Sequence, residues 1–103
     1  MATTSKMLAR ANMNVGSTLY YTSPLNGTVI VTNIAVTNTT SNAATFSLEL
    51  ETFPLHSATA IPANSTVYID CKQVMNASGI AKQITGTAST TGLVLHISGV
   101  EIV

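Results

Sequence analysis

The chain has 103 residues, a length that fits one compact domain and leaves no room for separate catalytic and binding modules. Only 8% of the residues are charged, 46% are hydrophobic and the formal net charge is zero, which argues against a disordered chain. The few basic residues are scattered and form no stripe that could neutralise several phosphates, so no nucleic-acid partner is expected: Lys6, Arg10, Lys72 and Lys82.

Neither a signal peptide nor a membrane span is predicted. Residues 1–16 contain basic residues but no apolar signal core, and no stretch approaches the about 20 apolar residues that a bilayer span needs. We therefore expect a protein that is made in the cytoplasm, is not secreted and has no membrane partner. The single cysteine, Cys71, cannot form an internal disulfide, so the fold should depend on packing alone.

Residues 1–16 lack two-residue alternation and are predicted to form an N-terminal arm outside the folded domain. Their apolar side chains would be exposed on an isolated domain, and methionine suits adaptable contacts, so we expect this arm to dock on a neighbouring subunit. Deleting residues 2–15 should then leave the domain folded. The candidate interface residues are Lys6, Met7, Leu8, Arg10 and Met13 in the arm, with Tyr20 and Tyr21 just after it.

From residue 17 onward, short runs of β-branched and aromatic residues alternate with turn residues, which is typical of many short strands. A strand is predicted over 18–22, because Pro24 ends it. The strongest strand prediction covers 28–39, with apolar residues on both faces as in a central strand. One face would carry Ile30, Ile34 and Val36, and the other Val29, Val31 and Ala35.

The second half continues the pattern of short strands. Residues 46–51 alternate between an apolar and a charged face, residues 55–63 make a connection or a short edge strand, and residues 66–71 place Cys71 in the core. Residues 73–79 are predicted to be a loop, and strands should follow at 80–88 and 93–103. The last strand would turn Leu93, Leu95 and Ile97 inward.

Six to eight short strands at this spacing predict an all-β, antiparallel two-sheet β-sandwich over residues 17–103, jelly-roll-like in arrangement. A domain of this size has a thin core, and its neutral surface offers little repulsion between copies. We therefore expect the isolated protein to be a homo-oligomer, either a dimer or a trimer.

Candidate catalytic groups are few, and each has a plainer interpretation. Cys71 could pair with His56 or His96, but it lies on the apolar side of its strand, where cysteine is usually inert. Glu49 and Glu51 share the wet face of one strand without a third ligand. We predict no catalytic residues, no cofactor and no metal. The remaining candidates are explained by a solvated surface or by composition: Asp70 and the sequons at Asn26, Asn38, Asn64 and Asn76.

The tyrosines allow two interpretations. Tyr20 and Tyr21 could anchor an interface, since tyrosine is enriched at such sites, or one of them could be a core residue and the other a rim residue. A carbohydrate-binding sandwich would need exposed aromatics beside polar groups, for which Tyr20, Tyr21 and Tyr68 are the tyrosines available. The absence of tryptophan counts against that function.

The layout of the chain resembles a group of small phage virion proteins. It shares with them a Leu-Tyr strand with a proline and glycine turn, a Val/Ile-rich strand running into Asn-Thr, an Ile-Pro-Ala segment and a closing aliphatic strand ending in Gly-Val-Glu. It differs over 70–79, where a Leu-x-x-Gly-Asp turn is usual. The matching elements are Leu19-Tyr20 with Pro24 and Gly27, Val29–Ile34 followed by Asn38-Thr39, Ile61-Pro62-Ala63, and Leu93–Ile97 with Gly99-Val100-Glu101.

This resemblance implies a non-enzymatic structural protein of the virion, assembled in the host cytoplasm. One expectation is a capsid decoration (cement) protein that stabilises the shell by binding major capsid subunits. The alternative is a neck, tail or fibre accessory protein, whose partner would be a tail protein. A pilus subunit would share this composition, but it should carry a signal peptide and paired cysteines, and the sequence predicts neither.

Overall fold

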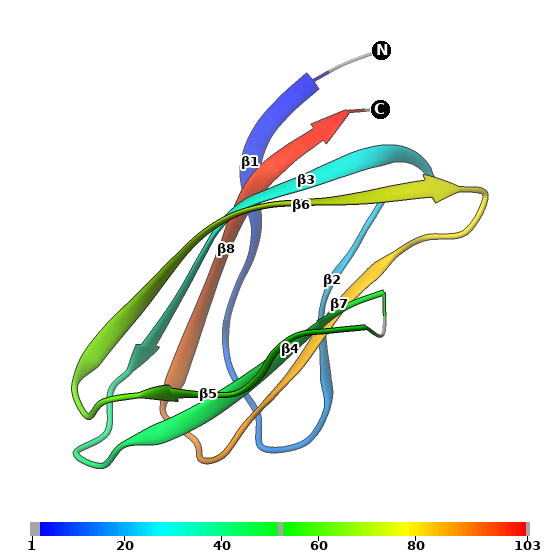
Figure 1. The fold of residues 1–103 in the computed structure, drawn as a ribbon. Coiled ribbons are helices and arrows are strands. Elements are labelled where there is room, and N and C mark those ends of the chain that lie inside the picture. The colour runs from blue at the N-terminus through cyan, green and yellow to red at the C-terminus, as the bar shows by residue number, and fades with distance from the viewer. Residues whose placement is uncertain (1–2, 52, 103) are drawn as a thin grey trace.

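The computed structural model describes residues 3–51 and 53–102, apart from the side chain of Cys71. These residues form strands joined by turns and short loops (Figure 1). The strands are β1 (Thr3–Asn12), β2 (Thr18–Thr22), β3 (Asn26–Asn38), β4 (Ala44–Leu50), β5 (Phe53–Ile61), β6 (Ser65–Ser78), β7 (Gln83–Ala88) and β8 (Leu93–Ile102).

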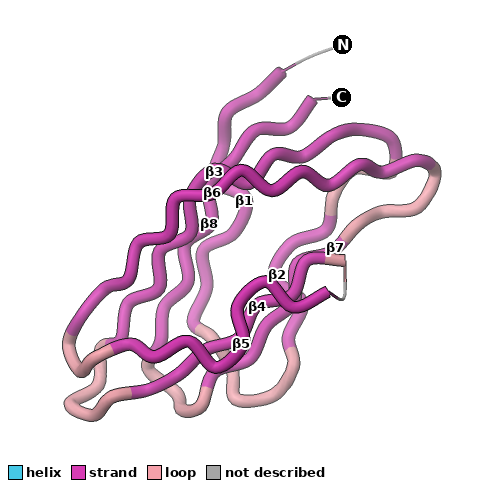
Figure 2. Tube along the Cα trace, in the orientation of Figure 1, coloured by secondary structure: helices cyan, strands magenta, loops and turns pink. Residues whose placement is uncertain are grey.

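The strands make two antiparallel four-stranded sheets, which confirms the predicted all-β sandwich. Sheet A has the order β1-β8-β3-β6 and sheet B the order β2-β7-β4-β5. Strand 1 therefore pairs with 8, 2 with 7, 3 with 6 and 4 with 5, as in one long hairpin folded over on itself. This is the connectivity of a jelly roll. The loops gather at the two ends of the sandwich (Figure 2).

The predicted arm is wrong for the described part of residues 1–16. Residues 3–12 are strand β1, which pairs with β8 along its length at the edge of sheet A. The pairing shifts register between Met7 and Ala9, so Leu8 is an extra residue and both Leu8 and Ala9 are buried. Because a bulge breaks two-residue alternation, this strand does not show the usual sequence pattern. The domain therefore includes β1.

The predicted faces of β3 need a correction for the same reason. Val29 and Val31 are buried in the first half of the strand, and Ile34 and Val36 in the second half. The register shifts at Thr32 between these pairs, so the inward face changes from odd to even positions. Ile30, expected to lie with Ile34 and Val36, is only partly buried.

The predicted loop over 73–79 is also wrong up to Ser78, because β6 continues that far beside β3. Met75 and Ala77 are buried on the inward side of this extension. Strand β7 begins at Gln83, so Ile80 lies in the preceding loop and is exposed. The prediction that Cys71 is a core residue lies outside the described side chains.

The irregularities of sheet A line up across the sheet. Leu8 in β1 and Thr32 in β3 are extra residues beside Ser98 and Gly99 of β8, and two residues of β6 lie opposite Thr32. The strands of this sheet bend at the same level (Figure 1). A Cβ on Gly99 would lie 2.3 Å from the Ile30 backbone oxygen and 2.8 Å from Leu8 Cδ1. The bend therefore requires glycine at position 99.

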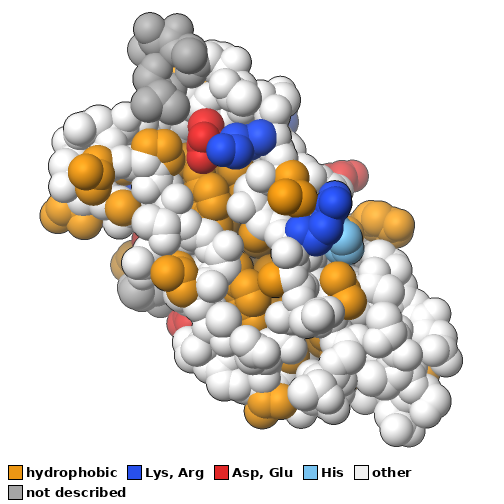
Figure 3. All heavy atoms as spheres, turned by 180° about the vertical axis from the view of Figure 1, so that it is seen from behind, with side chains coloured by type: hydrophobic (Ala, Val, Ile, Leu, Met, Phe, Trp, Pro, Cys, Tyr) orange, Lys and Arg blue, Asp and Glu red, His pale blue; other side chains and the backbone are white. Residues whose placement is uncertain are grey.

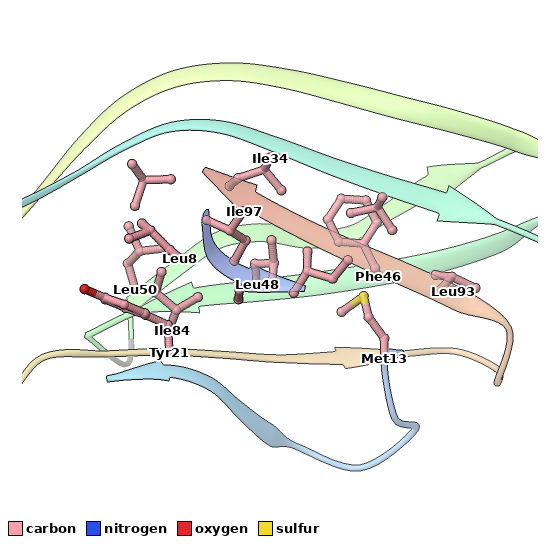
Figure 4. Close-up of a cluster of buried hydrophobic side chains, with 14 of the residues drawn as sticks. Leu8, Met13, Tyr21, Ile34, Phe46, Leu48, Leu50, Ile84, Leu93 and Ile97 are labelled. Carbon is pink, nitrogen blue, oxygen red and sulfur yellow. The ribbon is translucent and has the colours of Figure 1, made fainter. Parts of the chain in front are cut away.

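The core lies between the sheets and is filled by side chains from both of them. Figure 4 shows Ile34 and Ile97 of sheet A facing Leu48 and Ile84 of sheet B. Met13, in the loop after β1, is also buried there, and its backbone N–H donates to the Leu93 carbonyl oxygen at 2.7 Å. The predicted strands 46–51 and 93–103 have the expected inward residues: Phe46, Leu48 and Leu50 in β4, and Leu93, Leu95 and Ile97 in β8.

Asn38 is a buried polar residue with a complete set of partners. Its Nδ2 donates to the backbone oxygens of Asn42 at 2.8 Å and of Ile61 and Pro62 at 3.3 Å. Its Oδ1 accepts from the N–H and the hydroxyl of Thr40, at 2.9 and 2.7 Å. The side chain therefore joins the β3–β4 loop to the β5–β6 turn. From the sequence, Asn38 was explained only as part of a sequon that follows from composition.

Replacing Asn38 by alanine should lower the free energy of unfolding by about 1–3 kcal/mol, because several buried polar groups lose their partner. Urea denaturation followed by circular dichroism measures this loss. Asn26→Ala is the control, since Asn26 is exposed at the other end of β3 and accepts one bond from the Gly79 N–H. Equal stability of the two variants would contradict the assigned role of Asn38.

Candidate assembly surfaces

The described residues enclose no cavity that could hold a small ligand. Among them no three His, Cys, Asp or Glu side chains gather as a metal site would require. Within the same residues there is no helix with the length and apolar character needed to cross a bilayer.

Three of the predicted interface residues are core residues in the structure. Leu8, Met13 and Tyr21 are buried between the sheets (Figure 4), so they are not available to a partner. Of the two interpretations of the tyrosine pair, the core interpretation applies to Tyr21. Tyr20 is the extra residue of a bulge in β2 and packs partly buried against the core, and its hydroxyl accepts from the Asn14 N–H at 3.1 Å.

Tyr21 also forms a polar cluster that joins the two sheets at the end where the chain termini lie. Its hydroxyl, on β2, donates to Glu101 Oε2 on β8, and Lys6 Nζ on β1 lies 3.1 Å from Glu101 Oε1. Burial and the neighbouring carboxylate raise the pKa of Tyr21 far above its usual range. The Tyr21 hydrogen bond, with Lys6, lowers the pKa of Glu101 despite some burial. Lys6 therefore has a structural partner within the chain.

The other predicted interface residues lie on the outer face of β1. Met7 is half-exposed, and the Arg10 side chain is exposed with its Nε donating to His96 Nδ1 at 2.9 Å across the β1–β8 pair. Figure 3 shows the charged side chains of this face as small isolated groups among neutral ones. Met7 and Arg10 thus remain accessible, whereas the seven predicted residues as a set do not form one surface.

The acidic candidates have separate surroundings. Glu49 accepts from the Thr85 hydroxyl at 3.3 Å, and Glu51 forms an ion pair with Lys82 at 3.4 Å. They therefore do not act as a carboxylate pair. Asp70 is exposed on β6, where its Oδ1 accepts from Asn33 Nδ2 at 3.0 Å.

His56 is set apart from the acidic candidates. It lies on edge strand β5, with its ring centroid 5.7 Å from that of Phe46, and burial lowers its pKa. Its Nε2 is buried and unpartnered. An unpartnered nitrogen beside a phenylalanine is not the arrangement of an activated base, which needs a partner group to orient it.

An exposed apolar surface, missed by the sequence reasoning, lies at the end of the sandwich that carries the chain termini. Leu25 and Ile80 lie in the β2–β3 and β6–β7 loops and are 60% and 71% exposed, and Phe53, the first residue of β5, is 74% exposed. We call the surface that these three residues occupy the apolar end. Figure 3 shows hydrophobic side chains gathered over the β2–β3 and β6–β7 loops. The available sequence signal was a large apolar residue directly beside a proline or a glycine in each of the three segments.

Hydrogen bonds join the β2–β3 loop, the β6–β7 loop and Glu51, which follows β4, at this end of the sandwich. The Gly79 N–H donates to the Leu25 carbonyl oxygen at 2.9 Å, which links the β2–β3 and β6–β7 loops. The Glu51 N–H donates to the Gln83 carbonyl oxygen at 2.9 Å, and the Glu51 carboxylate pairs with Lys82. The loops that carry Leu25 and Ile80 are therefore bonded to each other, and Glu51, near Phe53, is bonded to the segment that leads into β7.

Comparison of the sequence with protein families and with curated proteins found no match. One solved structure is similar in its chain course, the structure of the infectious bursal disease virus Gx strain, with 8% sequence identity and a TM-score of 0.47. The alignment covers 97% of this chain and 30% of the viral chain, so this chain spans less than a third of the length of that neighbour. At this level of similarity the comparison assigns no family, and the description of the protein rests on its own fold and surfaces.

Proposed function

We propose that the protein is a structural component of a phage virion, and specifically a capsid decoration protein that attaches to major capsid subunits through its apolar end. The observation that carries the proposal is a jelly roll with three large exposed apolar side chains at one end, Leu25, Phe53 and Ile80. Exposed apolar surface of this kind marks protein contacts. The sequence resemblance to small phage virion proteins supports the same role.

The low charge and the filled core support a role in assembly over a role in catalysis. With 8% charged residues and zero net charge, copies packed on a particle do not repel one another strongly. A protein of the neck, tail or fibre would also need weak repulsion between packed copies, so these are the alternative locations in the virion. Glycan binding is less well supported, because Tyr21 is buried and Tyr20 is partly buried, which leaves Tyr68 of the three tyrosines considered.

Changing Leu25, Phe53 and Ile80 together to serine should weaken attachment to particles that lack the protein by about tenfold or more, since about 1.4 kcal/mol of binding free energy corresponds to that factor. Cosedimentation with purified particles measures the binding. The fold should be unaffected, because exposed substitutions typically change stability by about 0.5 kcal/mol or less.

The matched control is Val15→Ser with Leu19→Ser, because both side chains are exposed near the opposite end of the sandwich. This variant should bind particles as the wild type does. If the control loses binding while the apolar-end variant retains it, the docking surface has been placed at the wrong end. If neither variant changes binding, the apolar end has no role in attachment.

A further inference from the structure

The four edge strands of the sandwich differ in how well they are protected against pairing with another chain. Strand β1 carries the Leu8 bulge, and β2 has five residues with a bulge at Tyr20. Strand β5 contains Pro54, a positive φ at Ala58 and two register shifts. Bulges, prolines and short length are the usual ways in which proteins block an edge.

Strand β6 has less of this protection. It is 14 residues long and contains neither proline nor glycine. Its pairing with β3 shifts once, at residues 71 and 72, but even-numbered positions are exposed on both sides of the shift, from Tyr68 to Asn76, while Met75 and Ala77 face the core. A long edge strand that keeps its outward face across such a shift is a ready template for a further strand.

The outward side chains near the middle of β6 are self-complementary. We propose that two copies of the chain associate through their β6 edges, antiparallel and about a two-fold axis at residue 71. Positions whose numbers add to 142 are then opposite each other, so Asp70 faces Lys72 of the second copy and Tyr68 faces Val74. Two-fold symmetry repeats each pair, as a two-fold (isologous) interface requires.

The charges of β6 support a second copy as the occupant. Among the described residues the ion pairs are Lys6–Glu101 and Lys82–Glu51, and neither Asp70 nor Lys72 belongs to one. Asp70 is held on the outer face by Asn33 Nδ2 at 3.0 Å. In the two-fold arrangement each of these two charges has an opposite charge directly across the strands, whereas in-register parallel pairing would place like charges together.

The apolar pair adds to this complementarity. Tyr68 is 73% exposed and Val74 is 51% exposed, and an aromatic residue opposite a β-branched residue is a favourable cross-strand pair. The register shift of β6 against β3 falls at residues 71 and 72, which is the centre of the proposed pairing. The two-fold axis therefore places this shift beside the same shift in the second copy. Sheet A would then continue across the axis as one sheet from two chains.

This inference does not rest on the proposed virion role, because the dimer forms from the protein alone. Sedimentation velocity across the micromolar range should give a species of twice the 10.7 kDa mass of the chain. Asp70→Lys and Lys72→Asp should each raise the dimer Kd by about tenfold or more, since two favourable charge pairs become two repulsive ones.

Two combinations test the register directly. The double variant Asp70→Lys with Lys72→Asp keeps the total charge and should dimerise again. An equimolar mixture of the two single variants should form a one-to-one heterodimer, detected by native mass spectrometry, although each alone is monomeric. A wild-type monomer over the whole range, an oligomer insensitive to the single variants, or a double variant that stays monomeric would each overturn the proposal. None of these results affects the particle-binding test of the apolar end.

Discussion

Deletion of residues 2–15 should leave the chain unfolded, because it removes strand β1 from sheet A together with the buried side chains of Leu8 and Met13. Loss of one such side chain to alanine typically costs about 2–5 kcal/mol, and a domain of this size is stable by about 5–15 kcal/mol in total. The truncated protein should therefore show no cooperative thermal transition in circular dichroism.

A pair of neighbouring substitutions separates the role of β1 from an effect of truncation. Leu8→Ala should lower the free energy of unfolding by about 2–5 kcal/mol, whereas Met7→Ala, on the half-exposed outer face, should change it by about 0.5 kcal/mol or less. A truncated protein that melts cooperatively near the wild-type temperature would show that β1 is an arm after all.

Gly99→Ala should be the most damaging change of a single small residue. The new methyl group would lie 2.3 Å from the Ile30 backbone oxygen and 2.8 Å from Leu8 Cδ1, at the level where the strands of sheet A bend. A backbone atom cannot move aside as a flexible side chain can, so we expect a loss of about 3 kcal/mol, at the upper end of the cost of overpacking. Urea denaturation measures the loss.

Gly16→Ala is the matched control for this effect. A Cβ at Gly16 would have no atom within 4 Å, and the residue has no positive φ that would exclude a side chain. The free energy of unfolding of the Gly16→Ala variant should stay within about 1 kcal/mol of the wild-type value. A small gain is expected, because alanine restricts the unfolded chain more than glycine does. Similar losses from both variants would mean that the close approach at Gly99 does not limit the fold.

The regular strands were predictable from the sequence because nothing interrupts their alternation. Strands β4 and β8 show inward residues at every second position for at least five residues, and the structure buries the same ones. The two-sheet arrangement followed from the number and spacing of such runs. The strand order did not, because it depends on pairs such as β1 with β8 that are distant in the sequence.

The bulged strands could not be predicted in the same way. An extra residue at Leu8 puts two apolar residues in succession, and one at Thr32 reverses which positions of β3 face the core. Since alternation is the signal for a strand, β1 resembled an arm and β3 received the wrong inward face in its first half. The polar composition of residues 73–79 hid the end of β6 for a related reason, because only Met75 and Ala77 there are buried.

The candidate surfaces could not be predicted from the sequence for a different reason. Leu25, Ile80 and Phe53 belong to the β2–β3 loop, the β6–β7 loop and the start of β5, and the jelly-roll connectivity brings these segments to one end. Asp70 and Lys72 were visible as neighbours in the sequence, but their significance depends on β6 being an edge strand. Exposure of large side chains is a property of the fold, so the sequence pattern alone assigned interface roles to Leu8, Met13 and Tyr21, which are buried.

The copy number of the protein in purified virus particles tests the proposed function most directly. Quantitative mass spectrometry against the major capsid protein should find hundreds of copies per particle if the protein decorates the shell. A few to a dozen copies would move it to the neck or tail and contradict the shell position. Absence from particles, in cells that make both the protein and the particles, would contradict a structural role in the virion altogether.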